Sequence, residues 1–542
     1  MKHPKLVEAM SRPDFYPHRP EHVELVQTHI SYIFIAGDFV YKVKKAVDFG
    51  FLDFTTLNKR RRYCNEELRL NRRLAPAVYL EVVKIGVDRN GNIVFGKGKH
   101  VVEYAVKMRK IPQERMLKKL IPQGEVDCSI MDVTAKKLVD FHRHAETGGK
   151  IDKIGGIKTI RRNHDENFAQ TESYIDLTIP GYQYSFIKSY IYDFMKRHRR
   201  LLARRVAEQR IRDCHGDLHL EHICITGSGA TDAGDLLSVK RYTPDDIVIF
   251  DCIEFNERFR YEDVAAEVAF LTMDLDFNGY PDYANAFVSS YINHSHDHEI
   301  AKLLNFYKCY YAYVRGKVVG FRIHDMAISQ KDRDEAAKTA FRYFDLAYTY
   351  AALPEKPTLI LMAGLMGTGK SVRARCIAPR LDADIIHTDV LRKEILHIEP
   401  TNRHHDDFGK GIYSEDMTRT TYGKALELAT EKLKSGRSVI IDASYKDRRY
   451  RREAYRAAKS VHADFFIIEC TCPEDIIKER LDTRMSNSKR ASDGRWELFQ
   501  AQKESFHAIT EIPARSHIVI DAVQSPEECA YKALVKIKSF SP

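Results

Sequence analysis

The stretch Gly364-Leu365-Met366-Gly367-Thr368-Gly369-Lys370-Ser371 decides how the last third of this 542-residue chain folds. The apolar run that precedes it, 358–363, predicts a buried strand, and residues 372–378 after it predict the start of a helix. Glycines at three of these positions permit a tight turn in which successive backbone N–H groups face one point. The order strand, glycine loop, Lys-Ser and helix is typical of a phosphate-binding loop.

Each residue type in this loop has a predicted role. We expect Lys370 to reach the β- and γ-phosphates of a nucleotide and to act in catalysis, and Ser371 to contact Mg²⁺. The backbone of the remaining loop residues would cradle the phosphates, at the positive end of the following helix: Gly364, Gly367, Thr368 and Gly369. The alternative is a glycine turn that binds nothing. Because every fixed position and both flanks fit, the sequence favours a nucleotide site.

Two further strand ends carry polar residues in the same region. The run 383–387 predicts a strand that ends beside Asp389, and the run 438–444 predicts one that carries Asp442. Because parallel α/β folds place their ligands at the carboxyl ends of strands, Asp389 is a candidate general base and Asp442 a candidate Mg²⁺ ligand. Arg392 would clamp an anionic acceptor. The alternative for Asp389 is a helix N-cap without chemistry.

A candidate lid follows a fourth predicted strand, 463–470. The helix after it carries Arg480 and Arg484 and leads into the polar segment 485–494. We expect Arg484 to neutralise charge during phosphoryl transfer, as mobile arginines do in other phosphotransferases. Solvated arginines on a helix surface are the alternative. A final predicted strand, 517–521, and a closing helix complete the sheet.

The first 350 residues carry a second set of candidates. Residues 29–35 and 39–44 predict two strands joined by a turn, with Lys42 and Lys44 on one face of the second strand because side chains alternate. A predicted helix over 56–74 carries Glu67. A strand lysine and a helix glutamate hold ATP phosphates in protein-kinase-like folds, although such a pair alone is weak. The resemblance carried by the next motif implies nucleotide-binding roles for Lys42 and Glu67.

The clearest motif of this region is Cys214-His215-Gly216-Asp217-Leu218-His219-Leu220-Glu221-His222, followed by the apolar run 247–250 and Asp251. A carboxylate on a loop, a metal-ligating side chain five residues later and a second carboxylate at a strand end form the catalytic core of kinase-like phosphotransferases. Asp217 would accept the proton of an attacking hydroxyl, and Asp251 would hold a metal ion. At these residues the chain resembles the aminoglycoside phosphotransferase family, over roughly residues 25–345.

One position departs from that family. His222 stands where the family has a metal-binding asparagine. Mg²⁺ prefers oxygen ligands, whereas imidazole suits softer cations, so Mn²⁺ or Zn²⁺ enters consideration at this site. The resemblance implies a metal role for His222 and Asp251. The alternatives are a lobe that has lost catalysis, or a histidine that only packs beneath the loop.

The C-terminal part resembles the small P-loop kinases of the gluconate kinase, zeta toxin and polynucleotide kinase type. The whole chain is similar to a bacterial two-domain family in which a phosphotransferase-like half is fused to such a kinase. The resemblance implies a bilobal protein-kinase-like α+β fold for residues 1–350 and a P-loop fold with a parallel sheet flanked by helices for 358–542. Residues 351–357, which contain two prolines, would be the linker.

Composition narrows the class of protein. The chain is 44% hydrophobic and 30% charged, has a formal net charge of +10, and contains no apolar run long enough to span a bilayer. Its start lacks the apolar core of a signal peptide, and its ten cysteines form no paired zinc pattern, which predicts a cytoplasmic protein without membrane contact. The positive charge permits nucleic acid but does not require it.

Together these features predict a bifunctional ATP-dependent kinase with two nucleotide sites. It would transfer the γ-phosphate of ATP to a hydroxyl of a small metabolite, with ATP and Mg²⁺ as cofactors and Mn²⁺ considered at the first site. One alternative is a polynucleotide 5′-hydroxyl kinase. Another is a P-loop kinase regulated by an N-terminal pseudokinase. The sequence identifies neither the acceptor nor the oligomeric state.

Overall fold

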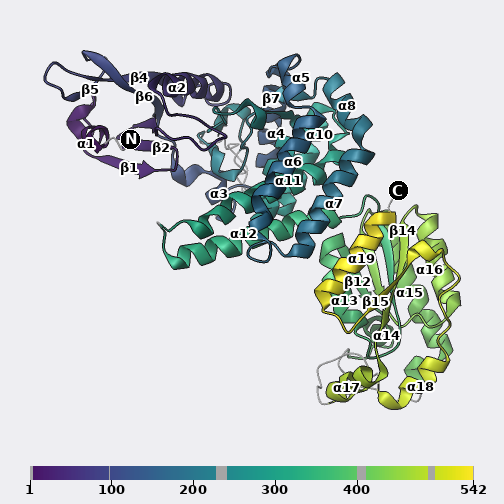
Figure 1. The fold of residues 1–542 in the computed structure, drawn as a ribbon. Helices are drawn as coiled ribbons and strands as arrows, with labels where there is room; N and C mark the ends of the chain where they lie inside the picture. The colour runs from purple at the N-terminus through teal and green to yellow at the C-terminus, as the bar shows by residue number, and fades with distance from the viewer. Residues whose placement is uncertain are drawn as a thin grey trace. The chain divides into compact units, whose positions relative to one another are not determined.

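A computed structural model describes residues 4–96, 98–227, 241–326, 328–399, 410–485 and 495–540. The chain divides into two compact units (Figure 1). The first contains residues 1–179 and 188–347, and the second contains residues 180–187 and 348–542. Among the described residues, no helix is both long and apolar enough to cross a membrane. The division at 350 and 358 expected from the linker prolines stays a prediction.

The first unit begins with a six-stranded antiparallel sheet in the order β1-β2-β3-β6-β4-β5. Its strands are β1 (Val23–Gln27), β2 (Ser31–Ala36), β3 (Phe39–Lys44), β4 (Tyr79–Val87), β5 (Ile93–Phe95) and β6 (His100–Arg109). Strands β5 and β6 are separate, because Gly96 and Gly98 between them adopt left-handed backbone angles. Helix α1 (Pro4–Met10) and strand β1 were not anticipated from the sequence.

Helix α2 (Leu57–Asn71) crosses the sheet and carries Glu67. The Thr56 hydroxyl caps its first turn by accepting the Lys59 N–H, as threonine does at helix starts. Cys64 and Leu68 face a core shared with Tyr79 and Val106 of the sheet. This packing fixes the face of α2 that carries Glu67 against β3.

The rest of the first unit is mainly helical. Its helices are α3 (Leu117–Leu120), α4 (Ser129–His144), α5 (Lys150–Ile154), α6 (Ile157–Thr171), α7 (Gly181–Arg197), α8 (Arg199–Ala207), α9 (Val264–Phe277), α10 (Pro281–Ser295), α11 (Ile300–Gly320) and α12 (Gln330–Ala352). Helix α9 is buried on nearly every side, α10 and α11 pack against it, and α4 packs on α10. This bundle supports the polar loops described below.

Two short antiparallel pairs position those loops. They are β7 (Ile211–Asp213) with β10 (Tyr261–Asp263), and β8 (Ile223–Ile225) with β9 (Ile247–Ile249). The segment 214–222 lies between β7 and β8, and Asp251 follows β9 by two residues. Every residue of β8 is buried, so the loop before it starts from a fixed base.

The second unit is a doubly covered parallel sheet in the order β12-β13-β11-β14-β15. Its strands are β11 (Thr358–Ala363), β12 (Ala383–His387), β13 (Ser438–Asp442), β14 (Asp464–Thr471) and β15 (His517–Asp521). Its helices are α13 (Lys370–Ile377), α14 (Thr388–Ile395), α15 (Glu415–Lys434), α16 (Arg448–Ser460), α17 (Glu474–Met485), α18 (Trp496–Glu504) and α19 (Pro526–Phe540).

Helices cover both faces of this sheet (Figure 1). Helices α15 and α16 cover one face, where Ala425, Ala429 and Ala458 pack on Leu359 and Val439. Helices α13 and α19 lie together on the other face. Because both faces of its central strand β11 are buried, that strand is apolar along nearly its whole length.

Candidate active sites

In the first unit, Lys42 joins two carboxylates from distant parts of the chain. Its Nζ lies 2.9 Å from Glu67 Oε1 on α2 and 2.6 Å from Asp251 Oδ1 after β9. The Lys42 and Glu67 side chains are buried, whereas the Asp251 side chain is 41% exposed. The structure therefore brings together three residues that the sequence placed in one nucleotide site.

Lys44 forms a second ion pair on the same face of β3. Its Nζ lies 2.7 Å from Glu67 Oε2 and also binds Glu254, so Glu67 bridges both lysines. Lys44 was predicted on the same strand face as Lys42, without a partner. Glu254 was not predicted as part of the site. The signal for Glu254 was its place three residues after Asp251, at the end of the same apolar run.

Mutual attraction keeps this cluster charged. Burial alone would lower the pKa of Lys42, but the carboxylates of Asp251 and Glu67 raise it well above its ordinary value. Burial would raise the pKa of Glu67, and the two lysines lower it instead. Burial does raise the pKa of Glu254, although Lys44 opposes that change. Lys42 is thus a fixed cation, as contact with phosphate oxygens requires.

Asp217 lies among histidines rather than beside the lysines. Its Oδ2 is 3.6 Å from His219 Nε2 and 3.6 Å from His222 Nδ1. Burial would raise the pKa of Asp217, but His219, His222 and Arg315 lower it, so the group is a carboxylate. The sequence analysis assigned His222 and overlooked His219, although the two are only three residues apart in the quoted motif.

The loop that carries Asp217 is held by buried hydrogen bonds to α9. Glu267 Oε1 accepts the N–H groups of His215 at 2.7 Å and of Gly216 at 2.8 Å. Its other oxygen bonds His142 Nε2 at 2.6 Å. The His215 ring bonds the Phe250 carbonyl at 2.9 Å, which ties this loop to the segment that carries Asp251.

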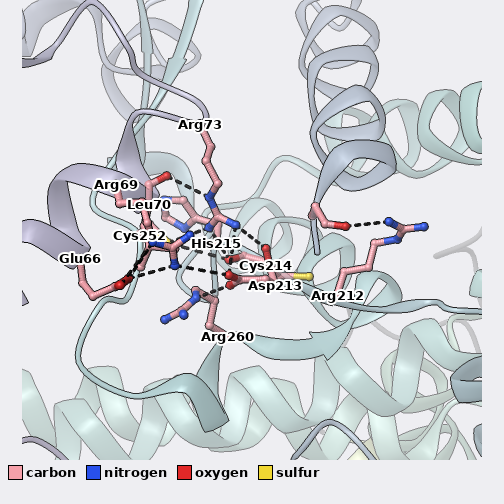
Figure 2. A network of polar contacts seen from close by, with 12 residues as sticks. Glu66, Arg69, Leu70, Arg73, Arg212, Asp213, Cys214, His215, Cys252 and Arg260 are labelled. Carbon is pink, nitrogen blue, oxygen red and sulfur yellow. Dashed lines mark hydrogen bonds and ion pairs between the residues drawn. The ribbon is translucent and has the colours of Figure 1, made fainter. Parts of the chain in front are cut away.

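A network of arginines fixes the strand that leads into the loop (Figure 2). Arg73 donates to the carbonyls of Asp213 at 2.6 Å and Cys214 at 3.0 Å, and Arg260 pairs with the buried Asp213 carboxylate. Because Arg73 follows α2, the helix of Glu67 and the loop of Asp217 are anchored to each other.

In the second unit, the glycine loop has the backbone that its sequence predicted. Gly364, Gly367 and Gly369 have φ values of 125°, 78° and 89°, in the region that favours glycine. A Cβ on Gly364 would lie 2.5 Å from the Cys470 carbonyl oxygen. On the other side, Gln502 of α18 accepts the Met366 N–H at 2.7 Å. The loop is therefore rigidly placed between β11 and the helices that follow β14.

The side chains at the start of α13 converge on Asp442 at the end of β13. Burial would raise the pKa of Asp442, but His387, the Ser371 hydroxyl and the Lys370 ammonium lower it. Lys370 Nζ donates to the Leu365 carbonyl at 2.8 Å, across the loop. His387, 2.8 Å from Asp442 Oδ2, was not anticipated, although it ends the neighbouring strand β12.

Asp389 and Arg392 contact each other. Both lie on α14, and Arg392 Nη1 is 3.2 Å from Asp389 Oδ1. The Arg392 guanidinium lies over the Tyr413 ring. The residue at the N-cap of α14 is His387, not Asp389. The candidate general base and the candidate acceptor clamp are therefore one ion pair, which an anionic acceptor would have to open.

Of the two arginines in the candidate lid, the structure describes the side chain of Arg480. Arg480 of α17 donates to the Ala522 carbonyl at 2.9 Å and approaches the Thr368 carbonyl of the glycine loop at 3.5 Å. Arg484 lies in the last turn of α17, but its side chain falls outside the described residues, as do 486–494 of the predicted lid.

Comparison with known protein families gives a match that lies within the second unit. The family described as AAA domain matches residues 359–509, which include the glycine loop, Asp389 and Asp442.

Two relatives align with this chain over most of their length. Proteins of Mycobacterium bovis and Mycobacterium tuberculosis, both described as uncharacterized, are 29% identical to it over 470 residues, which cover 87% of this chain and 88% of each relative. A UPF0200 protein of Aeropyrum pernix is 29% identical over 152 residues, 27% of this chain and 73% of its own length.

Two solved structures align with different shares of the chain. A gluconokinase from Sinorhizobium meliloti is 20% identical, covers 34% of this chain and 94% of its own, and has a TM-score of 0.25. A choline/ethanolamine kinase family protein from Mesorhizobium loti is 12% identical, covers 64% of this chain and 99% of its own, and has a TM-score of 0.36.

Proposed function

We propose that this protein is an ATP-dependent phosphotransferase with two nucleotide sites, and that the second unit transfers the γ-phosphate to a hydroxyl of a small metabolite. The observation that carries the proposal is the geometry of the glycine loop. Three glycines with positive φ values lie between β11 and α13, with Lys370 and Ser371 in the first turn of the helix. This arrangement directs N–H groups and a cation at one phosphate chain.

The donors beside this loop fit Mg²⁺. Ser371 and Asp442 both offer oxygen atoms, and the Ser371 hydroxyl helps to lower the pKa of the Asp442 carboxyl. Hard cations prefer such oxygen donors. The two residues would hold the ion, which when bound offsets phosphate charge. Lys370 would exchange its bond to the Leu365 carbonyl for phosphate oxygens.

Transfer to an acceptor assigns roles to α14 and α17. Asp389 would accept the proton of the attacking hydroxyl once the acceptor opens its pair with Arg392, and Arg392 would then bind an anionic group of the acceptor. Arg480 already contacts the loop, so it can stabilise the transferring phosphoryl group, and Arg484 would reach it from the lid.

In the first unit, Lys42 would bind phosphate oxygens while Glu67 keeps it oriented, and Asp217 would orient an acceptor hydroxyl. The histidines around Asp217 favour a second candidate, in which this unit binds nucleotide and regulates the second unit without transferring phosphate. In the first candidate Asp217 is needed for phosphate transfer to one acceptor, whereas in the second it is needed for none.

The test is transfer of label from γ-labelled ATP, with Mg²⁺ and then with Mn²⁺, to pools of hydroxylated metabolites and to RNA with free 5′-hydroxyls. Wild type is compared with Lys370→Ala and Asp217→Ala, and with Lys424→Ala, an exposed lysine of α15, as the control. We expect Lys370→Ala to remove at least one labelled metabolite and the control to remove none.

The remaining outcomes separate the alternatives. A second product lost only with Asp217→Ala means two working kinases, whereas products unaffected by Asp217→Ala mean a regulatory first unit. Label in RNA would identify the polynucleotide kinase instead. Label transfer that survives Lys370→Ala unchanged would refute the proposed role of the second unit.

A further inference from the structure

The donors around Asp217 do not match the magnesium site that the first unit's fold implies. One ligand atom each from Asp217, His219 and His222 lies within 4.8 Å of the other two. Two of these three donors are imidazole nitrogens. Mg²⁺ keeps oxygen ligands in octahedral geometry, so a cluster rich in imidazole is poorly suited to it. First-row transition cations bind imidazole and carboxylate together.

The hydrogen bond of His222 prepares one nitrogen for a cation. Nδ1 lies 2.8 Å from the Asp217 backbone carbonyl, which can only accept, so Nδ1 carries the proton. Nε2 then keeps its lone pair, and it faces Asp251 Oδ2 at 3.7 Å. Metal-binding histidines are oriented by the same kind of bond from the other ring nitrogen. Ligands about 2.1 Å from one metal ion lie about 3.4 Å apart in a tetrahedral site, close to this spacing.

Asp251 divides its two oxygens between partners. Oδ1 binds Lys42 at 2.6 Å, and Oδ2 is the oxygen that faces His222. Asp251 also has a φ of 64°, a left-handed conformation that is uncommon for aspartate and that holds its carboxylate in this place. The lysine contact therefore leaves one oxygen of Asp251 directed at the histidine.

Exposure shows how a cation would enter. The side chains of Asp217 and Asp251 are 33% and 41% exposed, whereas those of His219 and His222 are 4% and 13% exposed. The imidazoles are therefore largely buried, whereas the carboxylates are accessible to solvent. On the carboxylate side, water or a phosphate oxygen can complete the coordination. His219 would bind the cation through Nε2 once its proton moves to Nδ1. This move loses only the long hydrogen bond, 3.4 Å, that Nδ1 accepts from the Glu221 N–H.

We propose that Asp217, His219 and His222 bind a divalent first-row transition cation in preference to Mg²⁺, with the second oxygen of Asp251 beside them, directed at His222. The cation site thereby distinguishes the first unit from the second, where Ser371 and Asp442 supply oxygen donors. The role of this cation in phosphate binding rests on the proposed function, but its binding does not.

The experiment titrates the full chain, freed of metal by a chelator and without nucleotide, with Co²⁺. Visible absorption reports nitrogen coordination, and competition with Zn²⁺ and with excess Mg²⁺ reports preference. We expect one Co²⁺ bound per chain with a nitrogen-ligand spectrum, displaced by Zn²⁺ and not by Mg²⁺. His222→Asn, which replaces imidazole by an oxygen donor, should weaken Co²⁺ binding about a hundredfold. His219→Gln should weaken it as well.

The control is His298→Ala, an exposed histidine of the same unit, which should bind Co²⁺ as wild type does. Circular dichroism checks that each variant is folded, and the two variants act through different donors, so failure of one to fold leaves the other decisive. Absence of Co²⁺ binding, displacement by Mg²⁺, or binding untouched by both variants would overturn the proposal. This titration measures no phosphate transfer, so its result is independent of the labelling test. A chain that binds Co²⁺ in the titration but transfers no label from ATP would refute the proposed function and leave the metal proposal standing.

Discussion

The two candidate sites are built in opposite ways. In the second unit, the phosphate cradle is one continuous stretch, 364–371, and its specificity comes from backbone angles at three glycines. In the first unit, the charged groups come from β3, α2, the loop after β7 and the segment after β9, and they bind one another. One site presents backbone N–H groups, whereas the other presents a network of ion pairs.

This difference predicts where each site is vulnerable. The continuous loop depends on conformation, so small additions at a glycine should damage it. The dispersed site depends on matched charges, so removal of one partner leaves another buried charge without compensation, which is costly.

Lys44→Met should destabilise the first unit most. Lys44 is buried and pairs with both Glu67 and Glu254, and loss of one partner from a buried ion pair costs about 3–5 kcal/mol. Urea unfolding at neutral pH measures the change, with Lys136→Met, an exposed lysine of α4, as a control expected to stay within about 0.5 kcal/mol. Adding Glu254→Gln should recover part of the loss. A Lys44→Met chain as stable as wild type would show that the network contributes little.

Gly364→Ala should weaken nucleotide binding by the second unit. Its φ of 125° is strained for alanine, and the new Cβ would meet the Cys470 carbonyl. Strain of about 3 kcal/mol corresponds to roughly a hundredfold in ATP affinity, measured by calorimetry. The matched control is Gly423→Ala within α15, where a Cβ meets nothing within 4 Å and should stabilise the helix by about 0.5–1 kcal/mol. Equal effects of the two substitutions would contradict the account.

His164→Phe should make the first unit less sensitive to acid. Burial lowers the pKa of His164 from 6.5 to about 3. The pKa of His164 is lower in the folded protein than in the unfolded chain. Its contribution to the free energy of unfolding is therefore complete above pH 6.5 and is lost as the pH falls from 6.5 toward 3. At pH 5 the loss is about 2 kcal/mol, which the variant should avoid. Unfolding is compared at pH 7 and pH 5, with the exposed His144→Gln as control. A wild-type acid response in His164→Phe would exclude this cause.

The same contrast explains what could be predicted from the sequence. The parallel sheet and the glycine loop follow from local patterns, because apolar runs and glycine spacing are visible within short windows. The pairing of Lys42 with Glu67 was expected only from the family resemblance, since the two residues lie on different elements. Glu254 and His387 were missed because their partners, Lys44 and Asp442, lie 210 and 55 residues away. The pairing of Asp389 with Arg392 was missed for another reason: each had been assigned to a substrate instead of to its neighbour three residues along α14.

The central claim is that the chain contains two nucleotide sites of different construction. The most direct test is the stoichiometry of a non-hydrolysable ATP analogue, measured by calorimetry in Mg²⁺ and in Mn²⁺ for wild type, Lys370→Ala and Lys42→Met. The account predicts two nucleotides per wild-type chain and one for each variant, with the Lys42→Met chain retaining the site that depends on Lys370. One nucleotide per wild-type chain, or a stoichiometry that neither substitution changes, would contradict it.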